Sequence, residues 1–427
     1  MNTKKILKML IALFASTIIA AGCSAQNGND SKKAEQSMEH SQHRSSQSNG
    51  ASNDKENTAI VVQEPSVYNE EASKNLLTLS TKNITRLNTD DPVELSVLVS
   101  QTVWPATHKE NQPNGIILAP LENWQATLAA ADLIHHPNNG PILFTKNNTI
   151  PNQVLNEIQR LNPLGIKDGT QIFVIGNLPK QELDKLKRYK VQQINETDYA
   201  ALAQKIDQLY AEVAGKLPES VIIGSFEEKA KLYTIPAANW IAHMEEPILY
   251  VSQNKIPKQT EEALKKRKGK ANIYILGPQS IISKEVEEKL KEFGKVTRIS
   301  GDTPTQQSVA FATFKDKKTG FGWGLNNPGH GLSFVSTKSP EMALAAAPFS
   351  HLGKHAPLIW LENGELTPEV YEFMATLKPT FENDPTVGPY NHAYLSGTEK
   401  LISYQTQGVI DEKLEIVPES GEGHGSH

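Results

Sequence analysis

Three short apolar runs in this chain each begin with a proline and resemble one another. Residues 141–144 read Pro-Ile-Leu-Phe, residues 247–250 Pro-Ile-Leu-Tyr and residues 357–360 Pro-Leu-Ile-Trp. The offsets between the prolines are 247 − 141 = 106 and 357 − 247 = 110. A short apolar run bounded by polar turns predicts a strand buried on both faces, as in a parallel sheet.

Each copy predicts the same order of elements around this strand. A second apolar run ends in Gly176, Gly277 or Gly397, where glycine permits a tight turn into a helix. A further strand precedes each proline, at 115–119, 221–224 and 332–336, and Leu-Ala-Ala-Ala follows it at 128–131 and 344–347. The middle copy has Ile-Pro at 235–236, so its helix is expected to start later or to be kinked. The alternation of strands and helices favours three similar α/β domains with parallel sheets.

A third recurring element leads from an arginine to a helix start. Arg86 precedes Asp91-Pro92 and Arg298 precedes Thr303-Pro304, and the offset from arginine to proline is the same in both, 92 − 86 = 6 and 304 − 298 = 6. Asp91 and Thr303 are suited to cap helices that begin at the proline, and Glu94 predicts a capping box in the first copy. The middle copy has Val-Gln-Gln-Ile-Asn at 191–195, without the arginine.

The beginning of the chain predicts export and a lipid anchor. Three lysines, Lys4, Lys5 and Lys8, precede an apolar run, 9–21, that is too short to span a bilayer stably. The run ends in Ala-Ala-Gly-Cys, and Cys23 is the only cysteine in the sequence. This resembles the bacterial lipobox, which implies removal of the signal peptide 1–22 and lipidation of Cys23. An ordinary signal peptide with a chance cysteine is the alternative.

Polar segments flank the repeats and limit the choice of partners. Residues 23–81 are expected to form a tether, because up to about residue 59 they contain almost no apolar side chains and cannot offset the entropy of ordering. Residues 416–427 form a polar tail, and its histidines, like those of the tether, are interpreted as solvated and not as metal ligands. The net charge of −5 provides no global basic field, so nucleic acid is not an expected partner.

Several of these features together resemble a known family. Arg-Ile-Ser-Gly-Asp at 298–302, Ala-Leu-Ala-Ala-Ala-Pro at 343–348, the Pro-Ile-Leu strand and the strand ending in glycine resemble the type 2 cell-wall-binding repeat of Gram-positive surface proteins. The resemblance covers repeats at 82–190, 191–295 and 296–415. It implies three Rossmann-like or Toprim-like α/β domains in a compact pseudo-threefold arrangement. It also implies non-covalent binding of an anionic wall polymer, teichoic-acid-like or an acidic polysaccharide.

The resemblance has departures, and they bear on the candidate ligand contacts. The family often has a second arginine after the aspartate of the turn, where this chain has Thr303, and the middle copy lacks the turn. Arg86 and Arg298 have the rigid fork that grips phosphate or carboxylate. The slightly favoured alternative is that each arginine ties its turn to a neighbouring repeat through a carboxylate such as Asp90 or Asp302. Asp302 is also a candidate contact, as part of the turn.

Aromatic and basic residues supply the remaining candidates. Trp323 lies in the glycine-rich segment 320–324 and is the best exposed candidate for stacking on a sugar ring, whereas Trp240 and Trp360 are expected in the core. Ligands of parallel sheets favour the loops at the carboxyl ends of the strands. The basic run 265–270 can attract an anionic polymer, but a solvated helix end terminated by Gly269 is favoured.

Enzyme motifs are lacking in the sequence. It contains no Gly-x-Ser-x-Gly, no His-Glu-x-x-His and no phosphate loop, and a lipidated Cys23 is not a nucleophile. We therefore expect a binding module without catalytic residues, cofactor or metal, anchored to the outer face of the cell membrane. A solute-binding lipoprotein of a transport system is the alternative, which would close two lobes over one cleft. An enzyme with an unrecognised site is a third possibility.

Overall fold

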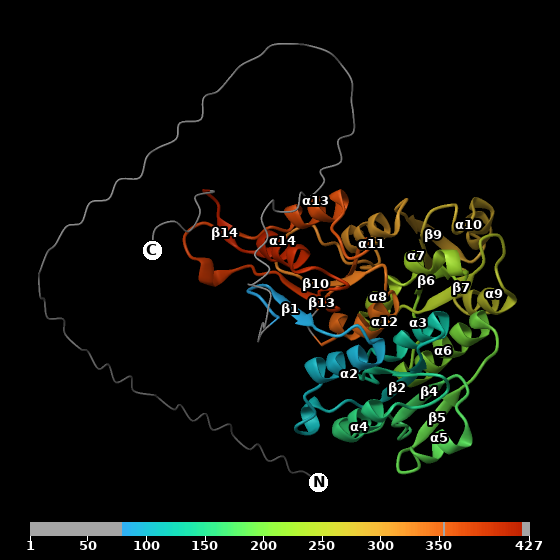
Figure 1. Ribbon diagram of the computed structural model, residues 1–427. Helices are drawn as coiled ribbons and strands as arrows, with labels where there is room; N and C mark the ends of the chain where they lie inside the picture. Colours follow the sequence, from blue (N-terminus) through green and yellow to red (C-terminus); the bar gives the residue numbers. More distant parts are fainter. Residues whose placement is uncertain (1–78, 353–354, 421–427) are drawn as a thin grey trace, which may run out of the picture. The chain divides into compact units, whose positions relative to one another are not determined.

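Three parallel sheets of four strands each form the fold (Figure 1). The predicted apolar runs supply three strands of each sheet, and the fourth was not predicted. The computed structural model describes residues 79–352 and 355–420. The predicted signal peptide, Cys23, most of the tether and the end of the tail lie outside the described residues. No helix in the described part of the chain has the length and apolar character needed to cross a membrane.

The strands follow one order in all three sheets, with the second strand along the chain at one edge and the first beside it. Unit one is the sheet β3-β2-β4-β5, unit two is β7-β6-β8-β9 and unit three is β11-β10-β13-β1, each with its helices. The bounds are β1 (Ile84–Leu87), β2 (Ile116–Pro120), β3 (Ile142–Thr145), β4 (Ile172–Ile175), β5 (Val191–Ile194), β6 (Ser220–Ser225), β7 (Ile248–Val251), β8 (Ala271–Leu276), β9 (Gly294–Ile299), β10 (Gly331–Ser336), β11 (Leu358–Leu361) and β13 (His392–Ser396). A small parallel pair, β12 (Thr380–Phe381) and β14 (Val417–Pro418), completes the list.

Helices separate the strands, and every unit has an opening helix before its first strand and a central helix after it. The opening helices are α2 (Pro92–Val103), α6 (Tyr199–Ala214) and α11 (Pro304–Thr313), and the central helices are α3 (Trp124–Ala130), α8 (Ala237–His243) and α12 (Glu341–Ala346). The others are α4 (Asn152–Leu161), α5 (Lys180–Asp184), α7 (Lys231–Thr234), α9 (Lys258–Lys265), α10 (Lys284–Leu290), α13 (Pro368–Thr376) and α14 (Tyr404–Leu414). Short 3₁₀ turns are η1 (Lys109–Asn111), η2 (Ala131–Leu133), η3 (Glu228–Ala230), η4 (Ala347–Ser350) and η5 (Pro385–Val387).

The sheet of unit three is closed by the strand that comes first in the chain. β1 pairs in parallel with β13, with Ile84 opposite Ala393, and Figure 1 shows the blue β1 beside the red strands of this sheet. The strands β5 and β9 occupy the same edge position in units one and two. The strands β5 and β9 therefore each belong to the sheet of the repeat before them. The strand β1, which has no repeat before it, belongs to the last sheet.

Contacts between the units repeat in a cyclic pattern. The opening helix of each unit packs on the segment after the first strand of another unit: α6 on α3, α11 on α7 and α2 on α12. The three central helices also meet one another. Alanines at 129–131 and 345–347 are buried, which lets the backbones approach closely. This arrangement confirms the predicted fold class of three α/β units with parallel sheets in a pseudo-threefold arrangement.

Aromatic residues at the ends of the proline-led strands join neighbouring units. The Tyr250 hydroxyl donates a hydrogen bond to the carbonyl oxygen of Gln125 at 2.7 Å, and Trp360 Nε1 donates to that of Leu232 at 2.8 Å. Both rings are fully buried, so the prediction that Trp360 is a core residue is confirmed. The corresponding Phe144 is also fully buried and has no polar group to donate.

Local signals in the sequence set most helix starts. Asp91 caps α2 by accepting a hydrogen bond from the Val93 amide at 2.9 Å, as predicted. The capping box predicted with Glu94 is wrong, because Glu94 accepts from the Thr89 hydroxyl at 2.5 Å while Thr89 Oγ1 accepts from the Asp91 amide. Thr303 and Gln306 form such a box at α11 instead. The expected break in the middle copy is confirmed, since α7 ends before Pro236 and α8 begins after it.

Candidate functional site

The two candidate arginines lie in matching networks inside the fold. Arg86 Nη1 donates to the carbonyl of Gly397 at 2.8 Å and Nη2 to that of Ile402 at 2.9 Å. Arg298 makes the same two bonds, to Gly277 at 2.7 Å and Ile282 at 2.9 Å. Each arginine thus holds the loop that follows the glycine-ended strand beside it in the sheet.

The third donor of each arginine faces the helix after that loop. Arg86 Nε donates to Gln407 Oε1 at 2.7 Å, and Arg298 Nε donates to Glu287 Oε2 at 2.9 Å. The carboxylates of Asp90 and Asp302, the possible partners suggested by the sequence, are not these acceptors. The Asp90 carboxylate accepts from the Thr398 amide and hydroxyl instead. Arg86 is only 6% exposed. Ligand contact by either arginine stays a prediction. The hydrogen bonds show that both arginines hold the loop and the helix that follow the glycine-ended strand.

In unit one, which lacks the arginine, a glutamine amide donates the matching hydrogen bond. Gln193 on β5 donates from Nε2 to the carbonyl of Gly176 at 2.9 Å, which is the bond that Arg86 and Arg298 make in the other sheets. The recurring position is therefore one that must satisfy the carbonyl of the strand-ending glycine. Repetition of the arginine along the chain reflects this requirement of the loop.

Asp302 and its turn lie against the start of α11. A Cβ on Gly301 would come within 2.3 Å of the Gln306 carbonyl carbon, so only glycine fits there. The Asp302 side chain is exposed, and its backbone carbonyl accepts from the Tyr233 hydroxyl at 2.8 Å. Tyr233 lines a cleft of about 440 Å³ at the carboxyl ends of β6 and β10. Asp302 is near this cleft but is not among its lining residues.

A different cavity contains Trp323, between α8 of unit two and the amino ends of β10 and β13 of unit three. Its volume is about 510 Å³. The lining consists of aromatic rings, histidines, glycines and a few aliphatic groups: Trp240, His243, Met244, Lys315, Gly320, Gly322, Trp323, Leu325, Gly329, His330, Gly331, His355, Tyr390, His392 and Tyr394. The cavity therefore lies at the edge of the sheet opposite to the one that the parallel-sheet argument favoured.

Trp323 is one wall of this cavity. Its ring stacks on that of His243, with centroids 5.1 Å apart and an interplanar angle of 14°, and meets Trp240 edge-on at 5.0 Å. Trp240 is 2% exposed, so its predicted place in the core is confirmed, whereas Trp323 is half-buried. Trp323 Nε1 is buried and has no hydrogen-bond partner among the described residues. A buried indole N–H without a partner is costly, and an acceptor on a bound molecule would satisfy it.

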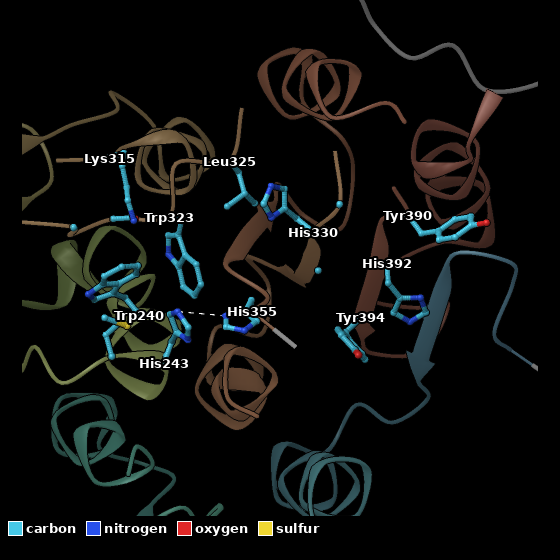
Figure 2. A pocket seen from close by; sticks show the side chains of 15 residues that line it. Trp240, His243, Lys315, Trp323, Leu325, His330, His355, Tyr390, His392 and Tyr394 are labelled. Carbon is cyan, nitrogen blue, oxygen red and sulfur yellow. Dashed lines mark hydrogen bonds between the residues drawn. The ribbon is translucent and has the colours of Figure 1, made fainter. Parts of the chain in front are cut away.

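Apart from two tyrosine hydroxyls and the indole groups, the polar side chains of the cavity are cationic or able to become so. Figure 2 shows His243 and His355 beside Trp323, with Tyr390, His392 and Tyr394 on the other side. Lys315 Nζ donates to the carbonyl of Gly322 at 2.8 Å at the rim. Four of the lining residues are histidines, and among the described residues that line the cavity none is acidic.

Burial keeps at least one of these histidines neutral near neutral pH. Burial lowers the pKa of His243 to about 4, and the charges of His355 and His135 act in the same direction. The pKa of His330 is also lowered, by burial and then by His355. In the described part of the chain, no group of three or more His, Cys, Asp or Glu side chains is placed to hold a metal ion. The cavity thus offers stacking faces, one indole donor, the Lys315 ammonium and titratable rings.

Sequence reasoning found only part of this site. Trp323 was named, but His243, His330 and His355 come from three distant segments that only the packing of units two and three brings together. A signal was present, since a histidine precedes each proline-led strand by four to six residues, at 135, 243 and 351. By the proline offsets of 106 and 110, His135 and His351 occupy equivalent positions, whereas the matching position of unit two is Ile241, two residues before His243.

Comparison with known proteins supports the fold. No family model and no curated protein sequence matches this chain. Among solved structures, Cwp6 from Clostridium difficile is similar with a TM-score of 0.63 and 15% identity, over 78% of this chain and 48% of that chain. Cwp8 from Clostridium difficile is similar with a TM-score of 0.59 and 20% identity, over 78% of this chain and 52% of that chain. This chain spans about half the length of each, and at these identities the likeness is one of fold.

Proposed function

We propose that this chain is a lipid-anchored surface protein that binds an anionic cell-wall polymer non-covalently through its three α/β units. The observation that carries the proposal is the cavity around Trp323, which combines stacking rings and cationic groups without a carboxylate in its described lining. The whole chain is acidic, with a net charge of −5, so attraction for a polyanion must come from such a local site.

Two further observations favour the wall as the binding partner. The repeats resemble the type 2 cell-wall-binding repeat, and Cwp6 and Cwp8, which share the fold, are cell wall proteins. A solute-binding lipoprotein closes two lobes over a single cleft, whereas this chain arranges three equivalent sheets around its central helices. A polymer offers many identical groups, so weak contacts spread over three units can add up to useful affinity.

Sedimentation with purified walls tests the proposal. Protein produced without the segment 1–23 should co-sediment with walls, and extraction of the anionic polymer should abolish this. Binding should weaken steeply with added salt, because the contacts are charge-assisted. Equal sedimentation with intact and extracted walls would refute the function.

Trp323→Ala tests the cavity within the same assay. We expect a loss of tenfold or more in apparent affinity, which corresponds to about 1.4 kcal/mol and is modest for a central aromatic contact. Tyr371→Ala is the matched control, because Tyr371 is a half-buried aromatic of unit three on α13 and does not line the cavity. If the two variants bind equally well, the polymer contacts another surface.

A further inference from the structure

Two histidines in the cavity are too close to be charged together without a counter-ion. His243 is the last residue of α8, and His355 lies just before β11. His243 Nε2 and His355 Nδ1 are 3.4 Å apart, and the ring centroids are 4.5 Å apart at 82° (Figure 2). With one ring donating to the other, the pair holds one shared hydrogen bond. A second proton would place two positive charges in contact.

The surroundings of His243 add positive charge and no nearby acid. Lys315 and His330 approach from the segment before β10, and His392 from β13. Behind the pair lie His351 of unit three and His135 and His136 of unit one, with ring centroids 5.0 to 5.8 Å apart. The carboxylates that follow α8 face the other way, because Glu246 accepts from Trp240 Nε1 at 2.9 Å and lines a separate cleft with Glu245.

The packing of the three units against one another explains why so many histidines gather. His243 ends α8, while His135 and His351 follow the turns η2 and η4. Both turns pack against α8, so the three histidines come from segments in contact. Burial, together with the charges of His136, His135, His243 and His355, lowers the pKa of His351 to about 3. His243 and His355 meet no carboxylate in the described lining of the cavity, so an anion that enters the cavity can stabilise protons added to them.

We propose that the cavity binds a phosphate or carboxylate group together with protons taken up by His243 and His355, so that its affinity for anions rises as the pH falls. The inference rests on the proposed function in that the natural source of the anion is the wall polymer. An anion beside the two rings replaces their mutual repulsion by attraction and favours their charged form. For each proton taken up on binding, affinity rises by up to about tenfold per pH unit.

Titration with two small anions tests the mechanism. Glucuronate represents an acidic sugar and sulfate represents a tetrahedral phosphate, and both keep a constant charge between pH 5.5 and 7.5, unlike phosphate itself. Binding is followed by calorimetry and by the imidazole C2–H resonances of the full folded chain. We expect the affinity for at least one anion to rise tenfold or more from pH 7.5 to 5.5, with proton uptake, while neutral glucose shows no such change. The arm that responds identifies the sugar acid or the tetrahedral anion as the preferred group.

Variants separate the titrating groups from the fixed charge. His243→Gln and His355→Gln should each remove most of the pH dependence, and Lys315→Gln should weaken binding equally at both pH values. His108→Gln, at an exposed histidine of the first unit, should change nothing. Thermal melts at pH 7.5 confirm that each variant is folded. Anion affinity that is independent of pH, or a pH dependence that survives in both histidine variants, overturns the inference.

Wall sedimentation at the same two pH values keeps this result distinct from the proposed function. If walls are bound but the small anions show no histidine-dependent pH effect, the function stands and the inference fails. If the small anions bind as expected but walls are not bound at either pH, the cavity is an acid-strengthened anion site and the proposed function fails.

Discussion

A buried ion pair between α6 and the end of α9 offers the most demanding test of the fold. Arg267 Nη1 and Nη2 donate to the Asp207 carboxylate at 3.0 and 2.9 Å, and the two side chains are 2% and 1% exposed. Arg267 also donates to the carbonyls of Pro218 and Ala263. The basic run 265–270 is therefore a helix end, as favoured from the sequence, with its arginine turned inward.

The perturbation is Asp207→Asn, which keeps the shape of the side chain and removes its charge. Breaking a buried pair on one side leaves an uncompensated charge and costs roughly 3–5 kcal/mol. A second acid moderates this cost. Asp132 is 1% exposed, and neither of its carboxylate oxygens has a hydrogen-bond partner among the described residues. Burial raises the pKa of Asp132 well above its usual range, and the charge of Asp207 raises it further while Arg267 lowers it.

Removing the charge of Asp207 should let Asp132 ionise and partly replace it. We therefore expect Asp207→Asn to cost about 3 kcal/mol at pH 7, at the low end of the range. Asp132→Asn alone should stabilise the protein at pH 7, because the folded state no longer has to hold a proton that the unfolded chain releases. The double variant should lose more than the sum of the single changes, by about 0.5–3 kcal/mol, as neighbours in one network do.

Urea denaturation of the unchanged chain, the two single variants and the double variant at pH 7 and pH 4 measures these changes in the free energy of unfolding. The gain from Asp132→Asn should shrink at pH 4, near the ordinary pKa of an aspartate, where the unfolded chain also retains much of the proton. A cost below about 1 kcal/mol for Asp207→Asn would refute the account of the ion pair. Additivity of the two changes within about 0.5 kcal/mol would refute the compensation by Asp132.

Three further predictions concern other parts of the chain. The free energy of unfolding should fall as the pH drops from about 6.5 toward 3. The reason is that His351 is protonated in the unfolded chain over this range but not in the folded chain, where its pKa is lowered to about 3. Thermal melts of His351→Gln should show a shallower fall. Arg86→Ala should lower the free energy of unfolding by about 3 kcal/mol or more, since three buried acceptors lose a charged donor, and an unchanged melt would favour a ligand role for the guanidinium instead. Cys23→Ala, outside the described residues, should abolish labelling with a fatty acid, and equal label in both proteins would contradict the lipid anchor.

The sequence indicated the units well because their signals are local. Proline-led apolar runs, glycine after a strand and a proline inside a helix each act through backbone geometry over a short stretch of chain. The α7 and α8 break at Pro236 and the buried Trp360 followed from such signals. The period of the repeat was sufficient to predict three similar parallel-sheet units.

What the sequence could not supply depends on contacts between distant segments. The acceptors of Arg86 lie near the other end of the chain, at Gly397, Ile402 and Gln407, so no spacing rule identifies them. The inward turn of Arg267 depends on Asp207 of another helix, and the cavity around Trp323 on the packing of units two and three. Chemistry at unit boundaries becomes predictable only after the arrangement of the units is known.

The pairing of β1 with β13 has a consequence for how the chain folds. Ile84 and Ala393 are register partners although they lie in the first and the last repeat. Such a contact raises the average sequence separation of native contacts, which slows folding. β1 leaves the ribosome early and its partner strand late, so the third sheet is incomplete until nearly the whole chain is made. Until then β13 presents an unpaired edge, and a chain that lacks residues 79–91 should expose that edge permanently and associate through it.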